Sequence, residues 1–187
     1  GKPFSGQRLA EVGTLRRPAV RALIVYPMNA LVEDQIRRLR RGLDSAAALG
    51  WLDIYRGGQR FYFGRYTGRT PVAVDVSNEH REKEYRRKLS AAFLNADALR
   101  RRENLAAAIA DDDQRRKTLD RIADERTFVP RIGGAEIFGR WDMIQAPPDI
   151  LITNFSMLNV MLMREREEPL FQATRDWLDA SAENHFT

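Results

Sequence analysis

Two short apolar runs, each followed directly by a helical pattern, constrain the fold of this chain more than any other feature. The run ALIVY ends at Tyr26, and the run ILIT ends at Thr153. Both are rich in β-branched residues, and continuous apolar runs of this length are typical of strands that are buried on both faces of a parallel sheet. Strand and helix therefore alternate at both ends of the chain. This order predicts an α/β fold with a parallel sheet flanked by helices.

The spacing of apolar residues predicts where the helices lie. Pro27 ends the first strand, and a helix starts at Asn29. Its apolar residues are Val32, Ile36, Leu39 and Leu43. A second helix follows the last strand, and a final helix begins at residues 167–169. Between the two apolar runs, the aromatic segment 59–66 predicts another strand, in which Gly64 marks a bulge or a close backbone approach.

The middle of the chain has a different character. Residues 78–126 are charged and rich in alanine, with apolar pairs at helical spacings, which predicts two or three helices laid on the surface. A less regular piece follows, bracketed by paired glycines and paired prolines. We interpret residues 74–147 as a mainly helical insertion into the α/β domain and residues 1–20 as a loop.

Composition excludes several classes of protein. The chain has no cysteine, which excludes disulfides, thiol nucleophiles, iron–sulfur clusters and cysteine-based zinc sites. Its two histidines, His80 and His185, are far apart in charged or terminal sequence, so we expect solvated side chains rather than a catalytic triad or a metal site. No apolar run approaches the roughly 18 residues that a membrane span needs. We expect a cytoplasmic protein with no membrane partner.

The charge balance points toward an anionic partner. The chain carries 31 basic and 26 acidic residues, and almost all of the basic residues are arginines. A guanidinium group can donate two hydrogen bonds at once to a phosphate, which makes nucleic acid a natural partner. The base composition of the coding DNA is a second explanation for an arginine excess, and both stay open.

Two strand-to-helix turns are the candidate site. One follows the first strand at residues 26–31, and the other follows the last strand at residues 153–158. The carboxyl ends of parallel strands meet at one edge of a sheet, where a starting helix directs free amides and its positive dipole end toward anions. The alternative is that Thr153 or Asn154 is an ordinary helix cap.

Three segments, in order along the chain, resemble motifs of superfamily two helicases. YPMNALVEDQ (residues 26–35) resembles motif Ia, and DILITNFSML (residues 149–158) resembles the motif Ib region of a subgroup of large DEAD/DEAH-box helicases. Between them, YTGRTP (residues 66–71) resembles that subgroup's Tyr-Asp-Gly-Asp-Thr-Pro segment. The resemblance covers about residues 21–71 and residues 148 to the C-terminus. The chain is most similar to the long bacterial helicases associated with repair or phage defence.

The resemblance implies a partial RecA-like domain, the first of an ATP-driven helicase, which grips the sugar-phosphate backbone of one strand without reading bases. DNA is expected in preference to RNA, and the other partners are the remaining helicase domains of the parent chain. Carried over by position, the nucleic-acid-binding residues are Met28, Asn29, Gly68, Arg69, Thr70, Thr153 and Asn154.

The sequence lacks the motifs with which a helicase binds and hydrolyses ATP. A helicase needs a G-x-x-x-x-G-K-S/T loop to cradle the nucleotide and an Asp-Glu pair at a strand end to hold magnesium. Gly1-Lys2 is followed by Pro3 where Ser or Thr is required, and residues 111–113 are three aspartates in a helical stretch that we expect on the surface. We therefore interpret residues 1–187 as a helicase ATP-binding domain truncated at both ends. ATP and Mg²⁺ would be bound by motifs absent from this chain, and the fragment is expected to be inactive.

Other interpretations follow from the same residues. A non-enzymatic nucleic-acid-binding or scaffold module with a degenerate helicase fold stays open, whereas a small-molecule enzyme is disfavoured because no acid–base pair or nucleophile stands out. The aromatic and arginine-rich segment 60–66 resembles a base-stacking strand, but we expect a core strand. The methionines at 157, 161 and 163 fit a partner groove or, as we expect, a helical core.

Overall fold

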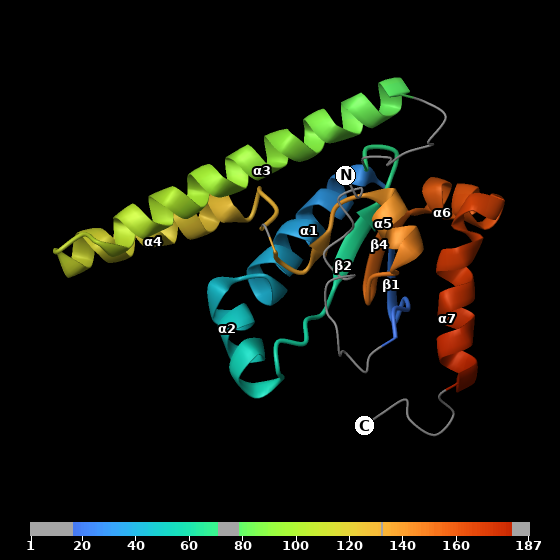
Figure 1. Cartoon of the computed structure of the whole chain (residues 1–187), viewed down its shortest axis with the longest axis horizontal. Helices are drawn as coiled ribbons and strands as arrows, with labels where there is room; N and C mark the ends of the chain where they lie inside the picture. Colours follow the sequence, from blue (N-terminus) through green and yellow to red (C-terminus); the bar gives the residue numbers. More distant parts are fainter. Residues whose placement is uncertain (1–16, 71–78, 132, 181–187) are drawn as a thin grey trace.

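A four-stranded parallel sheet organises the fold (Figure 1). The computed structural model describes residues 17–70, 79–131 and 133–180. In space the strand order is β1-β4-β2-β3. The strands are β1 (Ala22–Tyr26), β2 (Phe63–Tyr66), β3 (Glu136–Ile137) and β4 (Ile150–Asn154). The α/β class, with helices on both faces of a parallel sheet, is confirmed.

The register brings the ends of three strands to the same level. Tyr26 at the end of β1 pairs with Asn154 of β4. On the other side of β4, Thr153 pairs with Tyr66, the last residue of β2. The segments that follow β1, β4 and β2 therefore leave the sheet at one edge.

One face of the sheet is covered by α1 (Asn29–Leu43), and α2 (Ala46–Tyr55) follows it. Val32 and Ile36 of α1 are fully buried against Phe63 and Ile152 of the sheet. The i, i+4 spacing of the two α1 residues puts both side chains on one side of the helix, as the sequence predicts. Ser45 begins α2 by accepting a hydrogen bond from the Ala48 amide at 3.2 Å.

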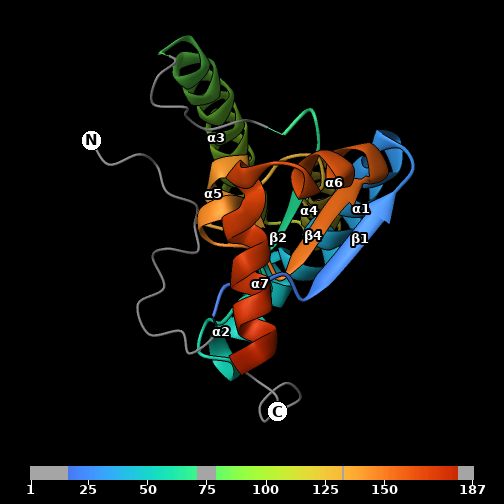
Figure 2. The ribbon, with the colours of Figure 1, turned by 90° about the vertical axis from the view of Figure 1, so that its right-hand side faces the viewer.

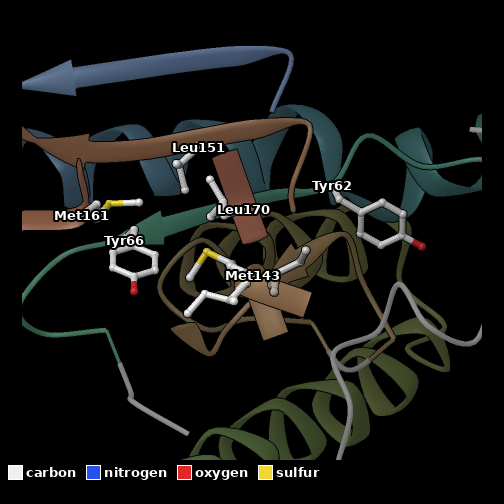
Figure 3. Packing of buried hydrophobic residues seen from close by; sticks show 8 residues of the cluster. Tyr62, Tyr66, Met143, Leu151, Met161 and Leu170 are labelled. Carbon is white, nitrogen blue, oxygen red and sulfur yellow. The ribbon is translucent and has the colours of Figure 1, made fainter. Parts of the chain in front are cut away.

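The opposite face is covered by α5 (Arg140–Gln145), α6 (Phe155–Leu162) and α7 (Glu168–Ala180), and the 3-10 turn η2 (Glu165–Glu167) joins the last two (Figure 2). Figure 3 shows the hydrophobic core between this face of the sheet and the helices that cover it. The buried residues of this core are Tyr62, Tyr66, Ile137, Met143, Ile144, Leu151, Met161 and Leu170. Two of these are tyrosines, so this face carries hydroxyl groups among its apolar side chains.

The helices α3 (Glu79–Ala107) and α4 (Asp112–Arg126) pack side by side and form an arm that projects from the sheet (Figure 1). Asp111 begins α4 by accepting a hydrogen bond from the Gln114 amide at 2.7 Å, and the neighbouring aspartates are exposed. The arm is tied to the domain through Arg40 of α1. This buried guanidinium donates to both carboxylate oxygens of Glu136, at 2.6 and 2.9 Å, and to the Thr127 carbonyl at 2.9 Å.

The elements differ from the predicted ones in two places. The strand predicted over residues 59–66 is shortened to β2, and β3 was not predicted at all. The segment 74–147 holds α3 and α4, but it also holds β3, which pairs with β2, and α5, which covers the sheet. The predicted close approach at Gly64 is confirmed, because a Cβ there would lie 2.6 Å from the Met143 sulfur.

Several smaller predictions have mixed outcomes. Of the methionines expected in a helical core, Met161 is fully buried, whereas Met163 is 86% exposed. His80 lies within α3, and His185 lies outside the described residues, as do residues 1–16. Within the described ranges, no helix has both the length and the apolar character that crossing a membrane requires.

Candidate nucleic-acid interface

The candidate site is the edge of the sheet where β1, β2 and β4 end. We call this the strand-end surface and define it by residues 27–29, 67–70 and 153–155. These segments are far apart in the sequence, but the register places all three beside one another. All seven residues predicted to bind nucleic acid lie here.

Asn154 links two of the three segments. Its side-chain amide donates to the Asn29 side-chain oxygen at 2.6 Å, and its own side-chain oxygen accepts from the Met157 amide at 2.7 Å. The second bond makes Asn154 the N-cap of α6, so the helix-cap interpretation is correct for this residue. The first bond fixes the start of α6 against the start of α1. Asn154 is therefore a positioning residue and is itself only 8% exposed.

The start of α1 is open to ligands. Met28 holds the N-cap position, and no side chain caps the first turn. The Met28 side chain is exposed, and Asn29 is exposed as well. Uncapped amides at the start of a helix of 15 residues carry the positive end of its dipole, which attracts anions. A carboxylate in the same helix, Glu33, is paired with Arg65 of β2, so its charge is compensated.

The loop after β2 is built by two buried threonines. The Thr70 hydroxyl donates to the Arg65 carbonyl at 2.7 Å and accepts from the Thr67 amide at 2.9 Å. The Thr67 hydroxyl accepts from the Arg69 amide at 3.3 Å. These bonds hold Gly68 and Arg69 at the exposed tip of the loop.

The predicted residues thus divide into two groups. Met28, Asn29, Gly68 and Arg69 are exposed, whereas Thr70, Thr153 and Asn154 are buried. The Thr153 hydroxyl donates to the Tyr66 carbonyl at 2.7 Å, which joins the ends of β4 and β2. The buried group therefore shapes the edge, and only the exposed group is free to contact a ligand. Contact with nucleic acid stays a prediction for all seven.

The sequence did not indicate a cluster beside this surface, in which Arg140 meets Tyr66 and Glu167 and which Arg164 and Arg166 also line. Arg140 donates to the Thr67 carbonyl and stacks on the Tyr66 ring, with its guanidinium carbon 5.0 Å from the ring centre. The Tyr66 hydroxyl donates to Glu167 at 2.6 Å. Burial and the neighbouring Glu167 raise the pKa of Tyr66, and burial lowers the pKa of Arg140. No local pattern signals this cluster, because its members meet only across the fold.

The described part of the chain contains no group of three or more acidic or histidine side chains placed to hold a metal ion. The full sequence also lacks the phosphate-cradling loop of a nucleotide site. The uncapped amides of α1 and the exposed guanidinium group of Arg69 give the strand-end surface groups that can bind anions.

Comparison with known proteins gives a similarity to part of a much longer chain. Over 193 residues the chain is 34% identical to Druantia protein DruE of Escherichia coli (strain UMEA 4076-1). The match covers 89% of this chain and 10% of that protein, so the chain spans about a tenth of the relative's length. No protein-family model matches the chain. No solved structure matches it either.

Proposed function

We propose that this chain is part of an ATP-dependent nucleic-acid helicase or translocase, in which it holds the backbone of one strand, DNA in preference to RNA. One observation carries the proposal: three segments that resemble helicase motifs end side by side at one edge of a parallel sheet. That edge offers the uncapped start of α1 and the exposed Arg69. Amides and guanidinium groups of this kind suit phosphates and are indifferent to base sequence.

The pairing of arginines supports this use of the strand-end surface. Many of the arginines form ion pairs with carboxylates of the same chain. Arg40 pairs with Glu136, and Arg102 of the arm pairs with Glu125. Arg69 forms no ion pair with any residue in the described ranges. Its charge is therefore available to a ligand at the tip of the loop after β2.

In this proposal ATP and Mg²⁺ are bound by other parts of the parent protein, and the remaining helicase domains are its partners. The 10% coverage of a longer relative fits a chain that is one piece of a large cytoplasmic enzyme. The isolated chain is then expected to bind nucleic acid and to hydrolyse no ATP. The competing function, a non-enzymatic binding module, predicts the same binding. DNA-stimulated ATP hydrolysis by the full-length parent protein separates the two.

Binding is tested by fluorescence anisotropy with a labelled oligo(dT) of about 20 nucleotides over a range of NaCl concentrations. We expect affinity that falls with salt and is shared by oligonucleotides of other sequences. Arg69→Ala removes one phosphate contact, so its affinity should fall about fivefold at roughly 0.1 M salt, with a slope shallower by about 0.7. Asn154→Ala should also weaken binding, because it releases the starts of α1 and α6.

The matched control is Arg116→Ala, which removes an exposed arginine from α4 of the arm. It should leave both the affinity and the salt slope unchanged. Circular dichroism checks that each variant is folded. Unchanged binding in both Arg69→Ala and Asn154→Ala would refute the strand-end surface as the binding site.

A further inference from the structure

A second positively charged site lies beside the strand-end surface, on the face of the sheet covered by α5 and α7. Three arginines line one small cavity there: Arg140 at the start of α5, and Arg164 and Arg166 in the turn between α6 and α7. Arg140 reaches the strand-end surface directly, through its bond to the Thr67 carbonyl. Arg140 therefore both lines the cavity and contacts the loop that presents Arg69.

The charges of this cluster are not balanced within the fold. Neither Arg164 nor Arg166 forms an ion pair in the part of the chain that the structure describes, and both are exposed. The carboxylate that lines the cavity, Glu167, is 1% exposed and forms no ion pair with the three arginines. Its bonded partner is the neutral Tyr66 hydroxyl. Glu165 belongs to the same turn but does not line the cavity. Three guanidinium groups thus face one buried carboxylate.

Two buried polar atoms of the cluster lack a partner. The Arg140 Nε and the Glu167 Oε2 are both shielded from solvent and form no hydrogen bond. Native folds rarely leave such groups unpaired, because each costs roughly 1–3 kcal/mol. The cavity between them measures about 20 Å³, which is room for one water molecule that would accept from Arg140 and donate to Glu167.

We propose that Arg140, Arg164 and Arg166 form a second phosphate subsite, which takes a backbone phosphate of the strand held at the strand-end surface. This inference rests on the proposed function and extends the backbone contacts beyond Arg69. The exposed Arg164 and Arg166 supply the guanidinium donors, and the half-buried Arg140 adds charge beneath them. Tyr66 is a positioning residue, because its ring lies against the Arg140 guanidinium, and Glu167 in turn fixes the Tyr66 hydroxyl.

The test is the double substitution Arg164→Gln/Arg166→Gln in the oligo(dT) anisotropy assay. Both side chains are exposed, so the fold should be retained. Because the subsite holds one phosphate, its loss should make the salt slope shallower by about 0.7 and lower the affinity roughly fivefold at about 0.1 M salt. The double substitution to lysine keeps the charges but loses the planar fork, so it should retain the salt slope and regain part of the affinity.

The matched control is Arg116→Gln/Arg121→Gln. It makes the same change of charge at two exposed positions of α4, which lies far from α6 and α7 (Figure 1). If the Arg164/Arg166 variant binds like this control while Arg69→Ala binds weakly, the second subsite is refuted and the proposed function stands. If the wild-type chain shows no salt-dependent binding at all, the proposed function itself fails, and the subsite fails with it.

A nucleotide triphosphate is a second source of the same phosphate chemistry. Competition with ATP, at matched ionic strength, distinguishes the two sources. For a backbone subsite, ATP should leave the difference between the wild-type chain and the Arg164→Gln/Arg166→Gln variant unchanged. Loss of that difference when ATP is added would assign the cluster to a nucleotide phosphate and overturn the backbone assignment.

Discussion

Asp44 makes the stability of this fold depend on pH. It follows α1, its carboxylate lies against Gly134 and Ala135 just before β3, and it is only 3% exposed. Its carboxylate accepts a hydrogen bond from the Ala135 amide at 2.7 Å. Burial raises the pKa of Asp44 from 3.8 to about 6, and the nearby Glu136 adds to the rise, while the Ala135 amide and Arg131 oppose it.

Because the pKa of Asp44 is raised in the folded chain, the free energy of unfolding decreases as pH rises. Below about pH 4, Asp44 is protonated in the folded and the unfolded chain, so it contributes no difference. Between pH 4 and 6 the unfolded chain releases the proton while the folded chain keeps it, so stability falls as pH rises. Above pH 6 the loss is complete. The rise in the pKa of Asp44 from 3.8 to about 6 lowers the free energy of unfolding by about 3 kcal/mol above pH 6, since each pKa unit corresponds to about 1.4 kcal/mol.

The perturbation is Asp44→Asn, whose side-chain oxygen can still accept from the Ala135 amide. We expect this variant to gain up to about 3 kcal/mol over the wild-type chain at pH 7–8 and to lose that advantage near pH 4. Urea unfolding followed by circular dichroism at several pH values measures the difference. The control is Asp120→Asn, the same change at an exposed position on α4. A variant that is less stable than the wild-type chain at pH 8 would refute the reasoning, since ionised Asp44 would then stabilise the fold.

Two further predictions concern packing and buried charge. Gly64→Ala places a methyl group 2.6 Å from the Met143 sulfur and 3.1 Å from the Ile137 carbonyl, so we expect a loss of about 1–3 kcal/mol in the free energy of unfolding. Gly42→Ala, where a Cβ meets nothing within 4 Å, is the control, and equal stability of the two variants would contradict the packing argument. Arg40→Met leaves Glu136 buried without its partner, so urea unfolding should show a loss of about 3–5 kcal/mol, and a loss below about 1 kcal/mol would count against it.

The sequence predicts β1 and β4 well because their signal is local. Both are continuous apolar runs, which identify strands without reference to the rest of the chain. The burial predicted from those runs is correct for β4 but wrong for β1, because β1 is an edge strand of the described sheet and its Leu23 is 46% exposed. The strand β3 has no such signal. It has two residues, and one of them, Glu136, is buried only because Arg40 of α1 neutralises it from 96 positions away. Composition cannot show such a pair.

At the candidate site too, features with a local sequence signal are predictable, and those formed by contacts between distant segments are not. The strand-end turns are predictable because each is a strand followed by a helix, and Asn154 as a cap is a local property. The arginine cluster is not predictable, because Arg140 lies in a segment that reads as an insertion. Its meeting with Tyr66 and Glu167 depends on β2, α5 and η2 coming together in the folded domain.

The caps at the strand-end surface also decide where an anion would sit. At the start of α6, the Met157 amide is already bonded to the Asn154 side chain, so part of the anion-binding capacity of that helix is used. At the start of α1, no side chain caps the first turn. The uncapped amides of α1 and the exposed side chain of Arg69 lie on either side of β4. A bound strand would therefore cross over the end of β4, with one phosphate at α1 and another at the loop after β2, rather than follow α6.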